Sequence, residues 1–183
     1  STFMLMPKSQ VGIKILNYYF LNPHARAYVN ELARILSLDP KNTHRKLEEL
    51  ERHGLLKSEF LGKQRYFNLA QNPLVKNFRQ VFLQTVGLES QLRQALKNIK
   101  GLEQAYIYGS YAKNTMDAGS DVDILAVGSH SVLEVEKAIQ QIQKHSGRPI
   151  NIMNLTESEL RQKKSQGNDF IKEIFSQKLI KIK

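Results

Sequence analysis

The sequence predicts an α+β protein built from two small domains and a helical bridge, with boundaries at residues 1–72, 73–100 and 101–183. Its length of 183 residues suits two small domains better than one large one. The first part reads as helices followed by one hairpin, whereas the last part alternates strands and helices. Charge is also uneven: 16 Lys and Arg stand against 7 Asp and Glu before residue 101, and 11 against 10 after it.

Composition narrows the function classes. The net charge of +10 lies almost entirely in the first hundred residues, which indicates a polyanionic partner for that half, although a merely soluble basic surface is the alternative. No apolar run reaches about 18 residues, so no membrane span is expected. The absence of cysteine excludes disulfides and thiolate metal sites, and it fits the expected cytoplasmic location.

Helical spacing, together with helix-capping and helix-breaking residues, predicts the N-terminal elements. Helical spacing predicts a first helix over residues 9–21, which ends before Pro23 because proline disfavours helix in the preceding residue. A second helix is expected over residues 31–36, with Asn30 as its N-cap.

A third helix and a hairpin follow. Asp39 can cap this helix, Pro40 suits its first position, and Gly54 can supply a left-handed stop. Two strands are then predicted over residues 55–60 and 64–69, with basic residues at the tip of the hairpin.

This order of elements is that of a winged helix-turn-helix. The runs 29–36 and 42–56 resemble MarR- and ArsR-type regulator domains, and the resemblance covers about residues 9–70. It implies that the third helix enters the major groove of double-stranded DNA. The residues expected at the DNA are Lys41, Asn42, His44 and Arg45 on the helix and Lys63 and Arg65 on the wing. The alternatives are a protein-docking module and, for His44, a solvated or packed side chain.

Two helices, over residues 74–86 and 88–99, form the expected bridge. Leu88, Leu92 and Leu96 recur at four-residue steps, which predicts one apolar stripe. The stripe either packs the two domains together or forms the seam of a homodimer, and the sequence favours neither.

The most informative stretch covers residues 106–127. It predicts a strand, a Gly109-Ser110 turn that opens a short helix, and a second strand with Asp121 and Asp123 on one face. Two carboxylates that close repel each other, and a divalent cation relieves the repulsion. The turn offers backbone N–H groups and a hydroxyl to an anion. A solvated surface hairpin is the bland alternative.

These residues resemble the DNA polymerase β-like nucleotidyltransferase superfamily, in its minimal nucleotidyltransferase branch, over about residues 101–183. The resemblance implies that Asp121 and Asp123 are catalytic and bind Mg²⁺ (or Mn²⁺). It also implies a nucleoside triphosphate held by Gly109, Ser110, Lys113 and Ser120. Because this branch is known from antitoxin-like proteins, a toxin-like protein partner is a further expectation.

The sequence departs from that family at one position. Active members carry a third carboxylate on a later strand, and the candidate strand here, residues 148–153, has Asn151 at its centre. An amide carries no charge and cannot act as a base, so the ion that activates the acceptor would be under-ligated. Arg148 either reaches the triphosphate or is a surface residue. Glu157 and Glu159 are expected to serve the start of a helix capped by Thr156.

The rest of the C-terminal domain is predicted as a mixed sheet backed by helices. A helix is expected over residues 132–145, and residues 179–182 suggest an edge strand. A last helix should cover one face of the sheet with four apolar side chains: Phe170, Ile171, Ile174 and Phe175.

Taken together, these patterns predict a DNA-binding, regulator-like protein whose second domain binds Mg²⁺-nucleotide and has weak or lost transfer activity. Nucleotide binding would then tune the binding of DNA or of a partner. One alternative is an active transferase that moves a nucleotide to a hydroxyl of a protein, an RNA or a small molecule. Another is an antitoxin-like interaction protein.

Overall fold

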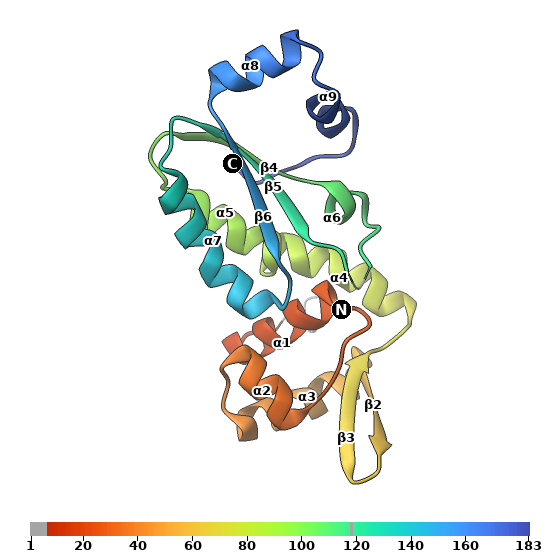
Figure 1. The fold of residues 1–183 in the computed structure, drawn as a ribbon. Helices are drawn as coiled ribbons and strands as arrows, with labels where there is room; N and C mark the ends of the chain where they lie inside the picture. The colour runs from red at the N-terminus through yellow and green to blue at the C-terminus, as the bar shows by residue number, and fades with distance from the viewer. Residues whose placement is uncertain (1–6, 118) are drawn as a thin grey trace. The chain divides into compact units, whose positions relative to one another are not determined.

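A computed structural model describes residues 7–117 and 119–183 of the chain (Figure 1). Backbone contacts divide the chain into two compact units. One unit runs to Ser90 and includes Lys144–Gly147, and the other holds Gln91–Gln143 and Arg148–Lys183. Among the described residues, no helix is both long enough and apolar enough to cross a membrane.

The N-terminal unit contains four helices and a small antiparallel sheet among its described residues. Their bounds are α1 (Gln10–Leu21), β1 (Arg26–Tyr28), α2 (Val29–Leu36), α3 (Pro40–Arg52), β2 (Leu56–Leu61), β3 (Gln64–Leu69) and α4 (Pro73–Thr85). The strand order is β1-β3-β2, so the predicted hairpin gains a third strand. Strand β1 was not predicted, because three residues without alternation carry no signal until β3 lies beside them.

Local capping signals in this unit are partly confirmed. Asp39 Oδ1 accepts a hydrogen bond of 2.8 Å from Asn42 N, and Gly54 has φ +74°, as the sequence predicts for the start and stop of α3. The prediction for α2 is wrong, because the helix begins at Val29 and Asn30 lies inside it. The pairing of Tyr28 with Tyr66 in the sheet fixes the residue before Val29 in an extended conformation.

A buried aromatic cluster forms the centre of the N-terminal unit. Phe20 of α1 meets Phe78 and Phe82 of α4 edge-on, with ring centroids 5.9 and 5.2 Å apart. The hydroxyl of Tyr19 donates to Phe67 O at 3.0 Å, and burial raises the pKa of Tyr19 far above its usual value. Helix α1 is therefore tied to both the sheet and α4.

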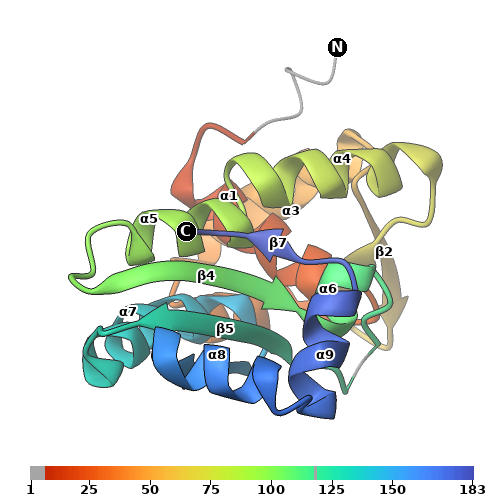
Figure 2. The same ribbon diagram turned by 90° about the horizontal axis from the view of Figure 1, so that it is seen from above.

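The C-terminal unit is built around a mixed four-stranded sheet of order β6-β5-β4-β7 (Figures 1 and 2). The remaining elements are α5 (Leu88–Leu96), β4 (Leu102–Tyr108), α6 (Gly109–Lys113), β5 (Val122–Gly128), α7 (Val132–Ser146), β6 (Ile150–Leu155), α8 (Glu157–Ser165), α9 (Asp169–Ser176) and β7 (Ile180–Lys181). Strand β5 runs antiparallel to β4 and parallel to β6, and β7 pairs with the other edge of β4. The predicted edge strand is confirmed as β7.

Helices α8 and α9 cover part of one face of this sheet. Leu125 and Val127 of β5 and Leu155 of β6 form a buried cluster with Leu160 of α8 and with two residues of α9, Ile171 and Ile174. Thr156 and Glu159 form a complete capping box at α8, so Glu159 serves the helix as predicted. Phe170 does not join this cluster, contrary to the prediction, and 46% of it remains exposed.

The leucine stripe of the bridge is core. Leu88, Leu92 and Leu96 of α5 are fully buried in the single chain, so their side chains are not available as a seam between two copies.

Candidate nucleotide and metal site

Three polar side chains lie in one row across the sheet. Strand register places Tyr108 of β4 opposite Asp123 of β5, and Asp123 opposite Asn151 of β6. Residues that pair directly across strands project from the same face. Asp121 immediately precedes β5, so it reaches the same face two residues earlier. We call Asp121, Asp123 and Asn151 the carboxylate site.

The Asn151 amide bridges the two carboxylates. Its Nδ2 lies 3.0 Å from Asp121 Oδ2 and 3.4 Å from Asp123 Oδ1 and donates to both. The position predicted for the missing third carboxylate is thus adjacent to the other two. An amide N–H donor there partly relieves the repulsion between two anions, but it supplies no charge.

The environment of Asp123 opposes its ionisation. Burial raises the pKa of Asp123 above its usual value, the charge of Asp121 adds to the rise, and the hydrogen bond from Asn151 opposes it. The pKa of Tyr108 is raised by burial and, to a smaller extent, by the negative charge of Asp123. A cation at these carboxylates would favour their charged forms.

The turn at the start of α6 lies directly against Asp123 of this site. Gly109 has φ +71°, and a Cβ at this position would lie 2.7 Å from Asp123 Oδ2. Only glycine tolerates both the left-handed backbone and the close carboxylate. Ser110 is half-buried in the first turn of α6, as the sequence predicts, and Lys113 is exposed in its last turn. The chain therefore brings Gly109 and Ser110 beside Asp123.

The loop before Asp121 is organised by its own hydrogen bonds. Ser120 Oγ donates to Asp117 Oδ1 at 2.8 Å and accepts from Asp117 N at 3.0 Å, which ties its hydroxyl to the loop. Hydrogen bonds from Ser120 and Gly119 lower the pKa of Asp117. Ser120 was predicted to bind the nucleotide, but this geometry suits a residue that shapes the turn.

Arg148 holds the backbone of the same loop by a hydrogen bond. It is 5% exposed, and its Nη1 donates to Ser120 O at 2.8 Å. The interpretation of Arg148 as a surface residue is therefore wrong. A buried guanidinium that holds the backbone next to Asp121 positions a carboxylate of the site.

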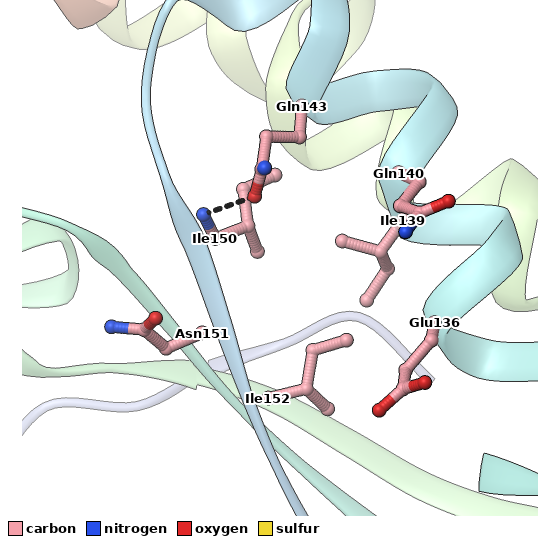
Figure 3. A pocket seen from close by; sticks show the side chains of 7 residues that line it. All are labelled: Glu136, Ile139, Gln140, Gln143, Ile150, Asn151 and Ile152. Atoms are coloured by element: carbon pink, nitrogen blue, oxygen red, sulfur yellow. Dashed lines mark hydrogen bonds between the residues drawn. The ribbon is translucent and has the colours of Figure 1, made fainter. Parts of the chain in front are cut away.

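A pocket of about 480 Å³ lies on the other side of β6 (Figure 3). Ile150 and Ile152 point into it toward Ile139 of α7, whereas the Asn151 side chain points away from it. Gln143 Oε1 accepts a 2.7 Å hydrogen bond from Ile150 N at this edge. The pocket is consequently separate from the face that carries the carboxylate site.

The carboxylate site fits a magnesium ion that arrives with its own ligands. Mg²⁺ is usually held by one or two carboxylates together with water and substrate phosphates. Asp121 and Asp123 can supply those two carboxylates. Among the described residues, no group of three or more His, Cys, Asp or Glu side chains could hold a metal ion. The residues present thus suit one nucleotide-bound ion better than a permanent metal centre.

Sequence reasoning missed Tyr108. The signal was available, because Tyr108 directly precedes Gly109 at the end of the strand predicted before the one that bears Asp123. What the sequence lacked was the register, which places the two side chains opposite each other.

In the N-terminal unit, four of the residues predicted to meet DNA lie near the start of α3. Lys41, Asn42, His44 and Arg45 are all exposed, while Thr43 between them is fully buried. His44 Nε2 lies 3.6 Å from Glu48 Oε1 one turn away. We call these four exposed residues the α3 surface.

The two hairpin residues predicted to contact DNA, Lys63 and Arg65, differ sharply in their surroundings. Lys63 is exposed in the turn between β2 and β3. Arg65 instead donates to Glu51, Glu48 and Ser58, and its guanidinium lies 4.9 Å from the centre of the Phe67 ring. Arg65 thus links the hairpin to α3, whereas Lys63 extends into solvent.

Comparison with known proteins assigns the C-terminal half. A family model described as "Nucleotidyltransferase domain" matches residues 89–182. No curated protein matches the chain. Among solved structures, a toxin–antitoxin complex with AMP-PNP is 17% identical, with 52% of this chain and 72% of that chain covered and a TM-score of 0.38.

Two other solved structures are similar at the same low level. A putative nucleotidyltransferase from Sulfolobus solfataricus is 22% identical, with 41% and 68% of the two chains covered and a TM-score of 0.29. TrmBL2, an archaeal chromatin protein, is 17% identical over 88% and 72% of the chains, also with a TM-score of 0.29. TM-scores this low carry no argument about this chain. The family model spans just over half of the sequence, and the chain therefore belongs to the nucleotidyltransferase domain family.

Proposed function

We propose that the C-terminal unit binds a nucleoside triphosphate together with Mg²⁺ or Mn²⁺ at the carboxylate site. The observation that carries this proposal is the convergence of Asp121, Asp123 and the Gly109 turn, where a Cβ would lie 2.7 Å from a carboxylate oxygen. Two adjacent carboxylates without a cationic partner are costly to keep together, and a shared metal ion offsets that cost. Family membership independently supports a nucleotide as the ligand.

Each residue has a role in this proposal. Asp121 and Asp123 ligate the ion that accompanies the phosphates, and the backbone of Gly109 and Ser110 faces the phosphate oxygens. Exposed Lys113 supplies positive charge nearby, and Ser120 keeps the loop in shape. When bound, the ion neutralises phosphate charge and orients the α-phosphate for attack.

We propose further that transfer is weak or lost. Asn151 occupies the position next to both carboxylates and presents an N–H donor to them. In two-metal transfer, a third carboxylate helps to hold the ion that activates the attacking hydroxyl. An amide can turn its oxygen toward a cation but adds no charge, so the activating ion is held less firmly.

Thermal denaturation with and without Mg²⁺-ATP, GTP or CTP tests nucleotide binding. The wild-type chain should gain stability with at least one Mg²⁺-nucleotide, and Asp121→Asn should remove this gain. Glu134→Gln is the control, because it removes an exposed carboxylate at the start of α7. A gain that Asp121→Asn leaves intact would place the nucleotide elsewhere.

The alternative is an active transferase, and family membership favours it. In this case Asp121 and Asp123 hold both ions, and the amide of Asn151 is tolerated. Incubation with α-labelled nucleotide and candidate protein, RNA and small-molecule acceptors separates the two proposals. Label transfer within minutes that requires Asp123 would establish this alternative.

For the N-terminal unit we propose a winged helix that binds double-stranded DNA through the α3 surface and Lys63. The support is local: Lys41, Arg45 and Lys63 form no ion pair with any described residue, and Asn42 and Arg45 have side chains able to read base edges. Strong positive charge in this half of the sequence agrees with a polyanionic ligand.

Gel-shift titration against genomic fragments over a range of salt concentrations tests DNA binding. Affinity should fall steeply with salt, because each phosphate contact releases counterions. Lys41→Ala and Arg45→Ala should each weaken binding by about 1–3 kcal/mol if these side chains read bases. Lys172→Ala removes the same charge from the C-terminal unit and should have little effect. Binding indifferent to salt and to both changes would favour an antitoxin-like docking protein.

A further inference from the structure

One aromatic side chain beside the carboxylate site is left in solvent. Phe170 lies in the first turn of α9, and the next residue, Ile171, is buried against the sheet. Nearly half of Phe170 is exposed, whereas Ile171 and Ile174 of the same helix are buried. This exposure leaves part of an aromatic ring available to a ligand.

Phe170 is held in place by Tyr108. The two ring centroids are 6.3 Å apart and the ring planes meet at 81°, an edge-to-face pair. Such pairs are favourable because the positive edge of one ring faces the negative face of the other. Tyr108 is itself partly buried against the cluster beneath α8 and α9, so it is a firm support.

The position of this pair points to the nucleotide and not to the acceptor. Tyr108 is directly followed by the Gly109 turn, which the proposed function assigns to the phosphates. Tyr108 and Asn151 also lie on opposite sides of Asp123, because β4 and β6 flank β5. The ion that activates the acceptor belongs on the Asn151 side. An exposed ring on the β4 side is therefore close to the rest of the nucleotide.

We propose that Phe170, supported edge-on by Tyr108, is the stacking platform for the base of the bound nucleotide. This inference rests on the proposed nucleotide site. Every nucleobase has a flat π-face, so the platform takes the base by stacking without reading its hydrogen-bonding edge. The ligand class is a nucleoside triphosphate of any base, and inorganic tripolyphosphate shares only its phosphate chain.

Calorimetric titration of the full chain with Mg²⁺-ATP and with Mg²⁺-tripolyphosphate tests the platform. Phe170→Ala should weaken ATP binding about tenfold, while tripolyphosphate binding stays within about twofold. Phe170→Tyr keeps a flat ring and should bind ATP like the wild type. Phe170→Leu keeps apolar volume without the π-face and should behave like Phe170→Ala. Phe60→Ala, which removes an exposed ring from β2 in the other unit, is the matched control.

The outcomes separate this inference from the proposed function. If the wild type binds neither ligand, the proposed nucleotide site is refuted, and the stacking platform is refuted with it. If the wild type binds both ligands with equal affinity, or if Phe170→Ala weakens both equally, the phosphate site stands and the platform is refuted. ATP affinity unchanged in both Phe170→Ala and Phe170→Leu would refute it as well. Because Phe170→Leu keeps the apolar volume, it separates the loss of stacking from any change that Phe170→Ala makes in the packing of α9.

Discussion

The carboxylate site and the cations around α3 differ in how their charges are paired. Asp121 and Asp123 converge without an ion pair to any described Lys, Arg or His, and their one shared hydrogen-bond donor is the neutral amide of Asn151. Two cations around α3, by contrast, are paired with glutamates. Lys46 meets Glu49 at 2.6 Å, and Arg65 bonds to Glu48 and Glu51.

This difference shows how well the formal charge of a domain indicates the ligand that its surface would bind. In the N-terminal unit the number of Lys and Arg residues overstates what a polyanion would meet, because Lys46 and Arg65 are paired with glutamates. In the C-terminal unit the formal charge is nearly balanced, yet two anions share one small area. Uncompensated charge at a site is a better guide to a ligand than the balance of a whole domain.

The largest expected effect comes from replacing Gly109 of the turn with a residue that has a Cβ atom. Gly109→Ala places a Cβ 2.7 Å from Asp123 Oδ2 at φ +71°. We expect a loss of about 2 kcal/mol in the free energy of unfolding and the loss of Mg²⁺-nucleotide binding, since the carboxylate must move. Urea denaturation and calorimetric titration measure the two quantities.

Gly119→Ala is the matched control for this change. Gly119 lies in the loop before Asp121, and a Cβ there would meet only Asp117 Oδ1 at 3.8 Å, an ordinary contact. Its stability and nucleotide binding should remain close to those of the wild type. Equal behaviour of the two variants would mean that the turn need not approach Asp123.

Much of this site could be predicted from local sequence. The Gly109-Ser110 turn and the alternation of Asp121 and Asp123 follow from spacing, because each depends on neighbours in the chain. The candidate position of Asn151 followed instead from the family resemblance. The pairing of Asn151 with Asp123 across β5 and β6 matches the expected third position. Periodicity also located the long helices, and capping chemistry placed the start of α3.

What the sequence did not reveal depends on distant parts of the chain. Arg65 looks like any exposed wing cation until α3 brings Glu51 beside it. Phe170 shares helical spacing with Ile171 and Ile174, yet it stays exposed while both isoleucines are buried. Periodicity reports which face a residue occupies, not whether that face is covered.

A smaller effect is expected when the neutral member of the carboxylate site becomes charged. Asn151→Asp places a third carboxylate within reach of Asp121 and Asp123, and we expect Mg²⁺ affinity to rise about tenfold in the presence of nucleotide. Without Mg²⁺ the variant should be less stable than the wild type, because three anions repel. Thermal denaturation with and without Mg²⁺ reports both signs.

Asn154→Asp adds the same charge three residues further along β6, where the wild-type side chain accepts a hydrogen bond from His130. Mg²⁺ affinity should not change in this control. If Asn151→Asp also leaves Mg²⁺ affinity unchanged, position 151 is not at the ion, and the weak transfer proposed for this chain needs another cause. If Asn151→Asp instead produces label transfer from α-labelled nucleotide, the missing third carboxylate alone accounts for the weak transfer of the wild type.

The smallest effects concern Lys63 and Arg65, the two hairpin cations predicted to contact DNA, and test which of them does so. Arg65→Met removes hydrogen bonds to Glu51 and Ser58, so the free energy of unfolding should fall by about 1 kcal/mol. Lys63→Met should change stability by less than about 0.5 kcal/mol, because Lys63 is exposed in the turn. In gel-shift titrations the Lys63 variant should reduce the salt slope by about one, as expected for one lost phosphate contact. The reverse pattern, with Arg65→Met as stable as the wild type but lower in salt slope, would show that Arg65 leaves its acidic partners to bind phosphate.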